Sequence, residues 1–187
     1  MESGSVGRTR GTISRAFALN LLLLLGATGN AQAGDGIELA GNILQFALPA
    51  TAYGMTAYRH DGDGALQYTE AAALTLGVTF TLKQTIDAER PDGGSQSFPS
   101  GHTSISFSAA EFVRKRYGWE YGAPLYAAAA FVGFSRVEAG RHYVRDVIAG
   151  AAIGIASSSF FTSPFPGWRI QLLADGGRFG LALGGSW

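Results

Sequence analysis

Residues 97–116 read SFPSGHTSISFSAAEFVRKR, and this stretch decides the fold class. It opens with Pro-Ser-Gly at 99–101, residue types that favour a turn and the start of a helix. A helical pattern then runs over residues 103–116. The stretch therefore predicts a turn that opens a helix, with His102 at the start of that helix.

Further apolar runs of 12 to 20 residues lie on either side of this helix, at 39–58, 71–82, 123–137 and 147–166. Runs of this length fit both the buried helices of a bundle and membrane spans, and their many small residues suit close helix contacts in either setting. Pro49 and Gly54 interrupt the first run, so we expect a break there. The sequence predicts an all-α fold, a helical bundle.

The C-terminal segment follows a different pattern. Apolar residues alternate with others at 168–174 and 178–183, on either side of the turn-forming tripeptide Asp-Gly-Gly. Alternation on both sides of such a turn is typical of a β-hairpin. We expect a short hairpin that covers one side of the bundle.

The composition excludes several classes of protein. The chain has 187 residues, enough for one domain, and is 47% hydrophobic but 15% charged, against about 25% charged in a typical soluble domain. Its hydrophobicity excludes disorder. The 14 Lys and Arg against 14 Asp and Glu leave no basic excess for binding nucleic acid. The absence of cysteine excludes disulfides, zinc–cysteine sites and thiol catalysis.

The N-terminus has the pattern of a bacterial export signal. Three arginines precede a short apolar run at 16–26, and an Ala-Gln-Ala cleavage site ends at Ala33. We therefore expect a signal peptide at 1–33, a helical domain at 34–166 and the hairpin at 167–187. An uncleaved anchor helix is the alternative. We expect membrane association, at the bacterial inner membrane with the functional site facing the periplasm, and a soluble periplasmic protein is the alternative.

The polar residues that could carry chemistry gather in three segments, which read K-x6-R-P (83–91), P-S-G-H (99–102) and S-R-x5-H-x3-D (135–146). Lys83 and Arg90 are seven residues apart, about two helical turns, so we expect them on one face of a helix that Pro91 ends.

Cations in apolar surroundings need an anion, and the nearby acids are too few to pair with Lys83, Arg90 and Arg136. A phosphate dianion would satisfy all three. The backbone N–H groups of Ser100 and Gly101, at a helix N-terminus, would add to such an anion site. The three segments together therefore predict a phosphate-binding site that needs no metal ion.

Two histidines could then act on the phosphate. His142 precedes Asp146 by four residues, so the carboxylate can orient the imidazole of a nucleophile. His102, at the start of its helix, can act as general acid toward the leaving oxygen.

Taken together and in this order, the three segments resemble the type 2 phosphatidic acid phosphatase superfamily, which includes bacterial acid phosphatases and vanadium haloperoxidases. The resemblance covers residues 83–146 and, with the flanking helices, roughly 40–163. It implies a helical bundle and metal-independent hydrolysis without a cofactor. It also implies that phosphate is bound by Lys83, Arg90, Ser100, Gly101 and Arg136. By the same resemblance the catalytic residues are His142 as nucleophile, His102 as leaving-group acid and Asp146 as partner of His142.

We therefore expect a phosphoric monoester hydrolase that removes phosphate from an ester or diphosphate through a phosphohistidine. The expected substrate is a membrane lipid, such as an isoprenyl diphosphate, phosphatidylglycerol phosphate, phosphatidic acid or lipid A. One alternative is a soluble acid phosphatase acting on small phosphate esters. Another is a vanadium haloperoxidase, since vanadate occupies the same cradle. A non-catalytic anion-binding module would need neither histidine.

Overall fold

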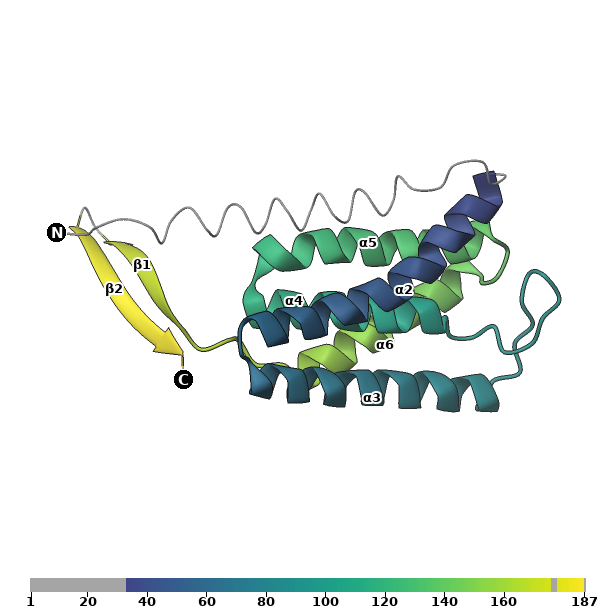
Figure 1. Ribbon diagram of the computed structural model, residues 1–187, viewed down its shortest axis with the longest axis horizontal. Helices are drawn as coiled ribbons and strands as arrows, with labels where there is room; N and C mark the ends of the chain where they lie inside the picture. Colours follow the sequence, from purple (N-terminus) through teal and green to yellow (C-terminus); the bar gives the residue numbers. More distant parts are fainter. Residues whose placement is uncertain (1–32, 176–177, 187) are drawn as a thin grey trace.

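The structure is a computed structural model that describes residues 33–175 and 178–186. The described residues form a bundle whose helices are α2 (Ala33–Tyr58), α3 (Gly62–Thr85), α4 (Gly101–Tyr117), α5 (Trp119–Glu138) and α6 (Val144–Phe161) (Figure 1). The predicted all-α bundle is confirmed. Nearly all of the expected signal peptide lies outside the described residues.

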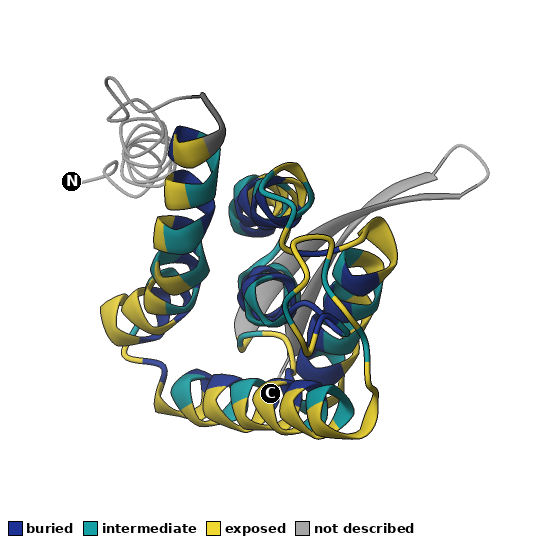
Figure 2. Ribbon diagram, turned by 90° about the vertical axis from the view of Figure 1, so that its right-hand side faces the viewer, coloured by how far each residue is buried: buried dark blue, intermediate teal, exposed yellow. Residues whose placement is uncertain are grey.

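Helix α4 is the centre of the bundle, since it contacts each of the other helices. Buried residues lie on the faces that the helices turn toward one another, and exposed residues on the outer faces (Figure 2). The largest fully buried apolar side chains come from α2, α3, α4 and α5: Leu44, Leu48, Tyr68, Phe112, Val113, Leu125 and Val132. This core fixes α4, and with it the turn that precedes α4.

Helix α6 lies directly on the backbone of α4. A Cβ atom at Gly154 would lie 2.2 Å from the carbonyl oxygen of Ser104, and one at Gly150 would lie 2.5 Å from that of Ser100. Only glycine allows so close an approach. The contact brings the start of α6 to the start of α4, where the backbone N–H of Ser100 donates to the carbonyl of Asp146 (2.9 Å).

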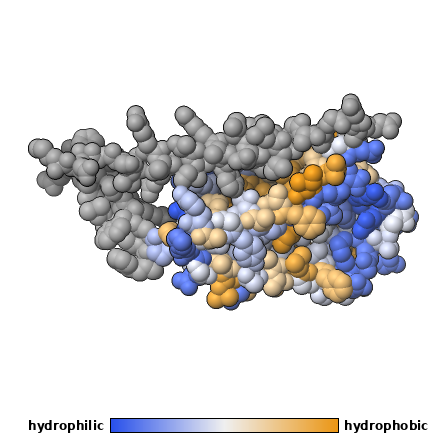
Figure 3. Space-filling view, viewed as in Figure 1, coloured by the Kyte–Doolittle hydropathy of each residue, from blue (hydrophilic) through white to orange (hydrophobic). Residues whose placement is uncertain are grey.

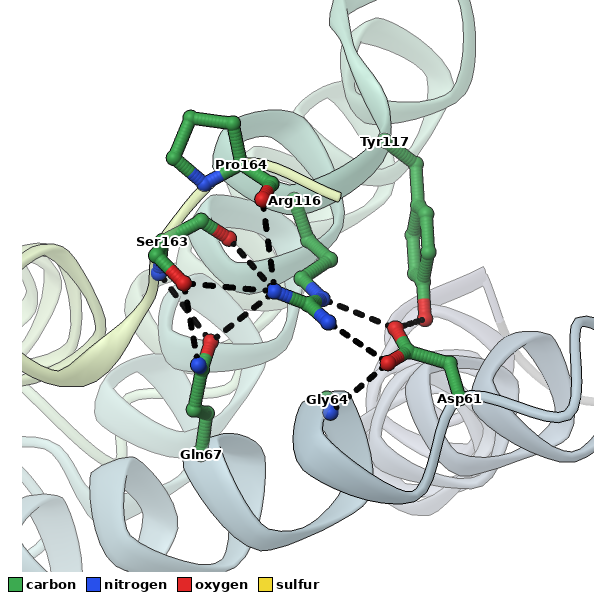
Figure 4. Close-up of polar contacts among 7 residues, drawn as sticks. All are labelled: Asp61, Gly64, Gln67, Arg116, Tyr117, Ser163 and Pro164. Carbon is green, nitrogen blue, oxygen red and sulfur yellow. Dashed lines mark hydrogen bonds and ion pairs between the residues drawn. The ribbon is translucent and has the colours of Figure 1, made fainter. Parts of the chain in front are cut away.

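The opposite end of the bundle is fastened by a buried polar cluster around Asp61 and Arg116 (Figure 4). Asp61 caps α3 by accepting from the backbone N–H of Gly64 (2.9 Å), and it binds the Arg116 guanidinium through both carboxylate oxygens (2.5 and 2.8 Å). Tyr117 donates to the same carboxylate (2.7 Å). Arg116 also donates to the carbonyl of Ser163 (3.0 Å). The cluster therefore joins the α2–α3 turn, the end of α4 and the segment after α6.

The expected break in the first apolar run is wrong, because α2 continues through Pro49 and Gly54 to Tyr58. Leu44 and Leu48 before the proline, and Ala52 after it, are all buried at helical spacing. Burying each leucine contributes about 1.5–3 kcal/mol, which offsets the roughly 3 kcal/mol that an internal proline costs.

The expected helical placement of Arg90 is also wrong. Helix α3 ends at Thr85, and Ile86 is already extended (φ −104°, ψ 109°), so Lys83 lies on a helix and Arg90 in the loop before α4. A residue that precedes proline is pushed out of the helical conformation, and the backbone N–H of Arg90 instead donates to the carbonyl of Gly94 (2.7 Å).

Two strands follow the bundle, β1 (Gly167–Asp175) and β2 (Arg178–Ser186). They pair antiparallel, with Gly167 opposite Ser186 and Asp175 opposite Arg178. This is the pairing that the alternating C-terminal pattern predicts.

Among the described helices, α6 is long and apolar enough to cross a membrane by its length and composition.

Candidate active site

A cavity of about 680 Å³ is lined by residues of α2, α3, α4 and α5, of the loop between α3 and α4, and of the turn before α6. Its volume is within the range of small-molecule sites. The polar residues predicted from the sequence that line it are Lys83, Arg90, Gly101, His102, Arg136 and His142. Residues up to 59 positions apart in the sequence therefore share one cavity.

His142 lies in the turn before α6 and is 4% exposed. Its Nδ1 is 3.6 Å from the Asp146 carboxylate, which is longer than a hydrogen bond, and Nδ1 has no hydrogen-bond partner among the described residues. Asp146 is fully buried, and its Oδ2 accepts from the hydroxyl of Ser97 (2.5 Å) and from the backbone N–H of Tyr143 (2.9 Å). These bonds fix the carboxylate on the Nδ1 side of the imidazole, and His142 lines the cavity.

His102 is the second residue of α4. Its Nε2 lies 3.0 Å from the amide oxygen of Asn42 on α2, and the Arg136 guanidinium donates to the same oxygen (2.9 Å). Arg136 also donates to the backbone carbonyl of Glu38 (2.8 Å). The start of α2 therefore contacts both the second histidine and one of the predicted phosphate ligands.

The other two cations come from α3 and from the loop. Lys83 donates to the backbone carbonyl of Gln96 (2.6 Å). The Nε of Arg90 is buried and has no hydrogen-bond partner among the described residues. Because neither cation has a carboxylate within ion-pair distance in the described chain, the cavity carries an excess of positive charge.

This charge and the burial of the site shift the basicity of its groups. Burial, with the charges of Arg136 and Arg90, lowers the pKa of His102 to about 4. Burial, with the charges of Lys83 and Arg90, lowers the pKa of His142 to about 4, although Asp146 acts to raise it. Burial and the nearby Arg90 lower the pKa of Lys83 to about 8. Both histidines are therefore neutral at pH 7.

Ser100 and Asp146 lie behind the cavity and do not line it. Ser100 is fully buried, its hydroxyl accepts from the Thr103 hydroxyl (2.9 Å), and its backbone N–H is already bound to Asp146. Among the residues of the turn, Gly101 and His102 line the cavity and Ser100 joins the two histidine-bearing segments.

Two residues of the site, Glu38 and Asn42, carried no signal in the sequence. Asn42 and Glu38 are single polar residues at the start of α2, one helical turn apart, and only the tertiary contact with Arg136 reveals them. Arg141 on the rim bridges Glu38 (3.0 Å) and Asp92 (2.9 Å). Ser97 adjoins the P-S-G-H segment, and its bond to Asp146 spans 49 positions.

Comparison with known proteins gives the same outline. The family model described as PAP2 superfamily matches residues 64–169. The lipid A 4'-phosphatase of Helicobacter pylori is 29% identical over 170 residues, which are 81% of this chain and 85% of that protein. The lipid A 1-phosphatase of Porphyromonas gingivalis is 36% identical over 99 residues, which are 49% of this chain and 22% of that protein.

Two crystal structures share the fold. Aquifex aeolicus LpxE matches with a TM-score of 0.58 and 20% identity, over 76% of this chain and 92% of that one. The PAP2-type phosphatidylglycerolphosphate phosphatase of Bacillus subtilis matches with a TM-score of 0.53 and 24% identity, over 83% of this chain and 86% of that one.

Proposed function

The chain belongs to the PAP2 superfamily and is a phosphatase, and from this premise we propose that it removes a phosphate group from lipid A through a phosphohistidine at His142. Action on a phosphorylated membrane lipid agrees with the names of the relatives above.

One observation carries the choice of a lipid: the cavity that holds the cations and histidines also has an apolar wall. Phe46, Pro49 and Tyr53 line it from α2, and Ala72 and Leu76 line it from α3. From Phe46 to Tyr53 the wall extends about 10 Å along α2. A phosphate on a hydrocarbon-bearing molecule matches both ends of such a cavity, whereas a small soluble ester would leave the apolar wall without a ligand.

The surface of the bundle supports an orientation at a membrane. Apolar side chains are exposed on α2 and α3, among them Phe46 (71%), Leu76 (52%) and Phe80 (64%). Because Phe46 and Leu76 also line the cavity, the cavity opens onto this apolar surface. Hydrophobic patches lie over the body of the bundle, and hydrophilic residues gather at the end that carries the loop before α4 (Figure 3). We propose that the apolar surface meets lipid and that the polar end, with the site, faces the periplasm after export.

In the proposed reaction, the Nε2 of neutral His142 attacks phosphorus in line with the ester oxygen. The P–O bond breaks, and His102 supplies the proton to the leaving alcohol. Lys83, Arg90, Arg136 and the N–H of Gly101 stabilise the charge on the phosphoryl oxygens. Water then attacks phosphorus, the bond between phosphorus and the Nε2 of His142 breaks, His102 takes the proton of the water, and inorganic phosphate leaves.

Phosphate release from lipid A in mixed micelles tests the proposal. Replacing His142 with Ala should remove nearly all turnover, since loss of a nucleophile has cost roughly 10⁶-fold in kcat in another enzyme. His60→Asn is the matched control, because His60 is exposed and lies in the turn at the other end of the bundle. Rapid quenching of the wild type should trap a phosphoryl label that survives alkali and is lost in acid.

Three results would contradict the proposal. If His142→Ala keeps more than about a tenth of the wild-type kcat, His142 is not the nucleophile, since such a loss is far below that expected of one. No trapped label under conditions of full turnover would exclude the covalent intermediate. A larger kcat/KM for nitrophenyl phosphate than for lipid A would favour the soluble acid phosphatase.

A further inference from the structure

We propose that Asn42 is a positioning residue for the leaving-group acid: its amide oxygen holds the Nε2–H of His102, so that Nδ1 is the nitrogen that gives its proton to the leaving oxygen. This inference rests on the proposed function. Asn42 lies on α2, before the residues that the family model matches.

The orientation of the Asn42 amide is fixed by Arg136. A guanidinium has donors and no acceptor, so the Asn42 atom 2.9 Å from Arg136 Nη1 has to be the amide oxygen. The opposite orientation of the amide would place two donors against each other. Arg136 is itself held, because its Nη2 donates to the Glu38 carbonyl one helical turn before Asn42 (2.8 Å).

The fixed amide oxygen then fixes the tautomer of His102. An oxygen that can only accept requires a hydrogen on the facing nitrogen, which is Nε2 at 3.0 Å. The tautomer of a histidine is set by the bond that one ring nitrogen makes, and the other nitrogen is left to titrate. The bond to Asn42 occupies Nε2, so Nδ1 is the remaining ring nitrogen, and His102 lines the cavity. Protonation therefore occurs at Nδ1.

The backbone shows that this contact is built into the fold. A Cβ atom at Gly41 would lie 1.9 Å from the Ser135 hydroxyl and 2.7 Å from Arg136 Nη2. A side chain at position 41 would therefore push α2 away from α5. Glycine next to Asn42 allows α2 to approach Arg136 closely enough for the shared oxygen.

A neutral amide differs from a carboxylate in one useful way. A carboxylate at this place would raise the pKa of His102 and neutralise part of the Arg136 charge. The amide orients the ring without placing a second carboxylate beside Arg136, whose Nη1 already lies 3.9 Å from the Glu38 carboxylate. His102 then takes up its proton when the negative phosphate enters.

The first experiment compares Asn42→Ala with wild type on two soluble substrates, an alkyl phosphate and nitrophenyl phosphate. Loss of general acid catalysis costs typically about 10²–10⁴-fold, so kcat for the alkyl phosphate should fall at least about 10²-fold. Nitrophenolate leaves without a proton, so its kcat should fall only a few-fold, and inhibition by vanadate should change little. The control is Ile43→Ala, the next residue of α2, which is 42% exposed and does not line the cavity.

The second experiment uses Asn42→Asp, which keeps the accepting oxygen and nearly the same shape. An opposite charge at this distance shifts a pKa by about 1–3 units, so the alkaline limb of kcat for the alkyl phosphate should move upward by at least about one pH unit. This readout does not depend on whether Asn42→Ala folds.

Equal losses on both substrates, together with weaker vanadate inhibition, would show that Asn42 serves phosphate binding through Arg136 and would overturn its role toward His102. An alkaline limb that stays in place in Asn42→Asp would overturn that role as well. A wild type that releases no phosphate from any ester would instead overturn the proposed function, and this inference with it.

Discussion

Lys83 and Arg90 make the cavity positive, and this charge decides where the catalytic proton comes from. With a pKa near 4, His102 has no proton to give at neutral pH. The monoanion of a phosphate ester, whose second pKa is about 6, can bring that proton with it. We therefore expect kcat/KM to rise as His142 becomes neutral above about pH 4 and to fall above about pH 6. The alkaline limb should move when esters with different phosphate pKa values are compared. A limb that stays near pH 8 for all esters would instead assign it to Lys83.

The sequence predicted the residues of the site better than their placement. Six of the predicted residues line the cavity, and Ser100 and Asp146 lie behind it. These residues could be recognised from the spacings of the three motifs, because each motif lies within one short stretch of the sequence. Arg90 was placed on the wrong element, because α3 ends at Thr85, well before the proline that was expected to end it. Asn42 carried no signal, because a single amide in an apolar run is informative only once its partner, 94 positions away, is known.

At the scale of elements, the contact between α4 and α6 sets the distance between the two histidines, and glycine makes it possible. Gly154→Ala places a methyl group against the Ser104 carbonyl, and we expect it to lower the free energy of unfolding by about 1–3 kcal/mol. Gly77→Ala is the matched control, since a Cβ atom there meets nothing within 4 Å. It should raise stability by about 0.4–1 kcal/mol. Chemical denaturation of both variants checks the pair, and equal stabilities would mean that α6 can move away from α4 without cost.

The helices themselves were predictable from their apolar runs, but their ends were not. The expected run at 147–166 begins three residues after the observed start of α6 at Val144, because the buried Asp146 side chain binds the backbone N–H of Tyr143 and so opens the helix earlier. Pro49 was expected to break α2, and only the burial of side chains on both sides of it keeps the helix continuous.

At the scale of the whole molecule, stability and catalysis lie at opposite ends of α4. Gly101 and Arg116 are about 22 Å apart along the helix. Arg116→Ala leaves the Asp61 carboxylate, 6% exposed, without its cation, and breaking a buried pair costs about 3–5 kcal/mol. We expect a matching loss in the free energy of unfolding and an unchanged kcat per folded molecule. Glu70→Ala, at an exposed residue of α3 away from the site, should change stability by less than about 0.5 kcal/mol. A fall in kcat for Arg116→Ala below its unfolding transition would show that the two ends are coupled.

The apolar residues that α2 supplies to the cavity come earlier in the chain than the catalytic motifs. The family match begins at Gly64, after α2 ends at Tyr58, yet α2 supplies Phe46, Pro49 and Tyr53 to the cavity. Much of the apolar wall thus comes from a helix that carries none of the three catalytic motifs. A graft of a relative's helix over residues 33–58 that keeps Gly41 and Asn42 would exchange the apolar residues of this wall while the three motifs stay in place. For enzyme engineering, substitutions in α2 could therefore change substrate preference while His102, His142 and the phosphate-binding cations are kept.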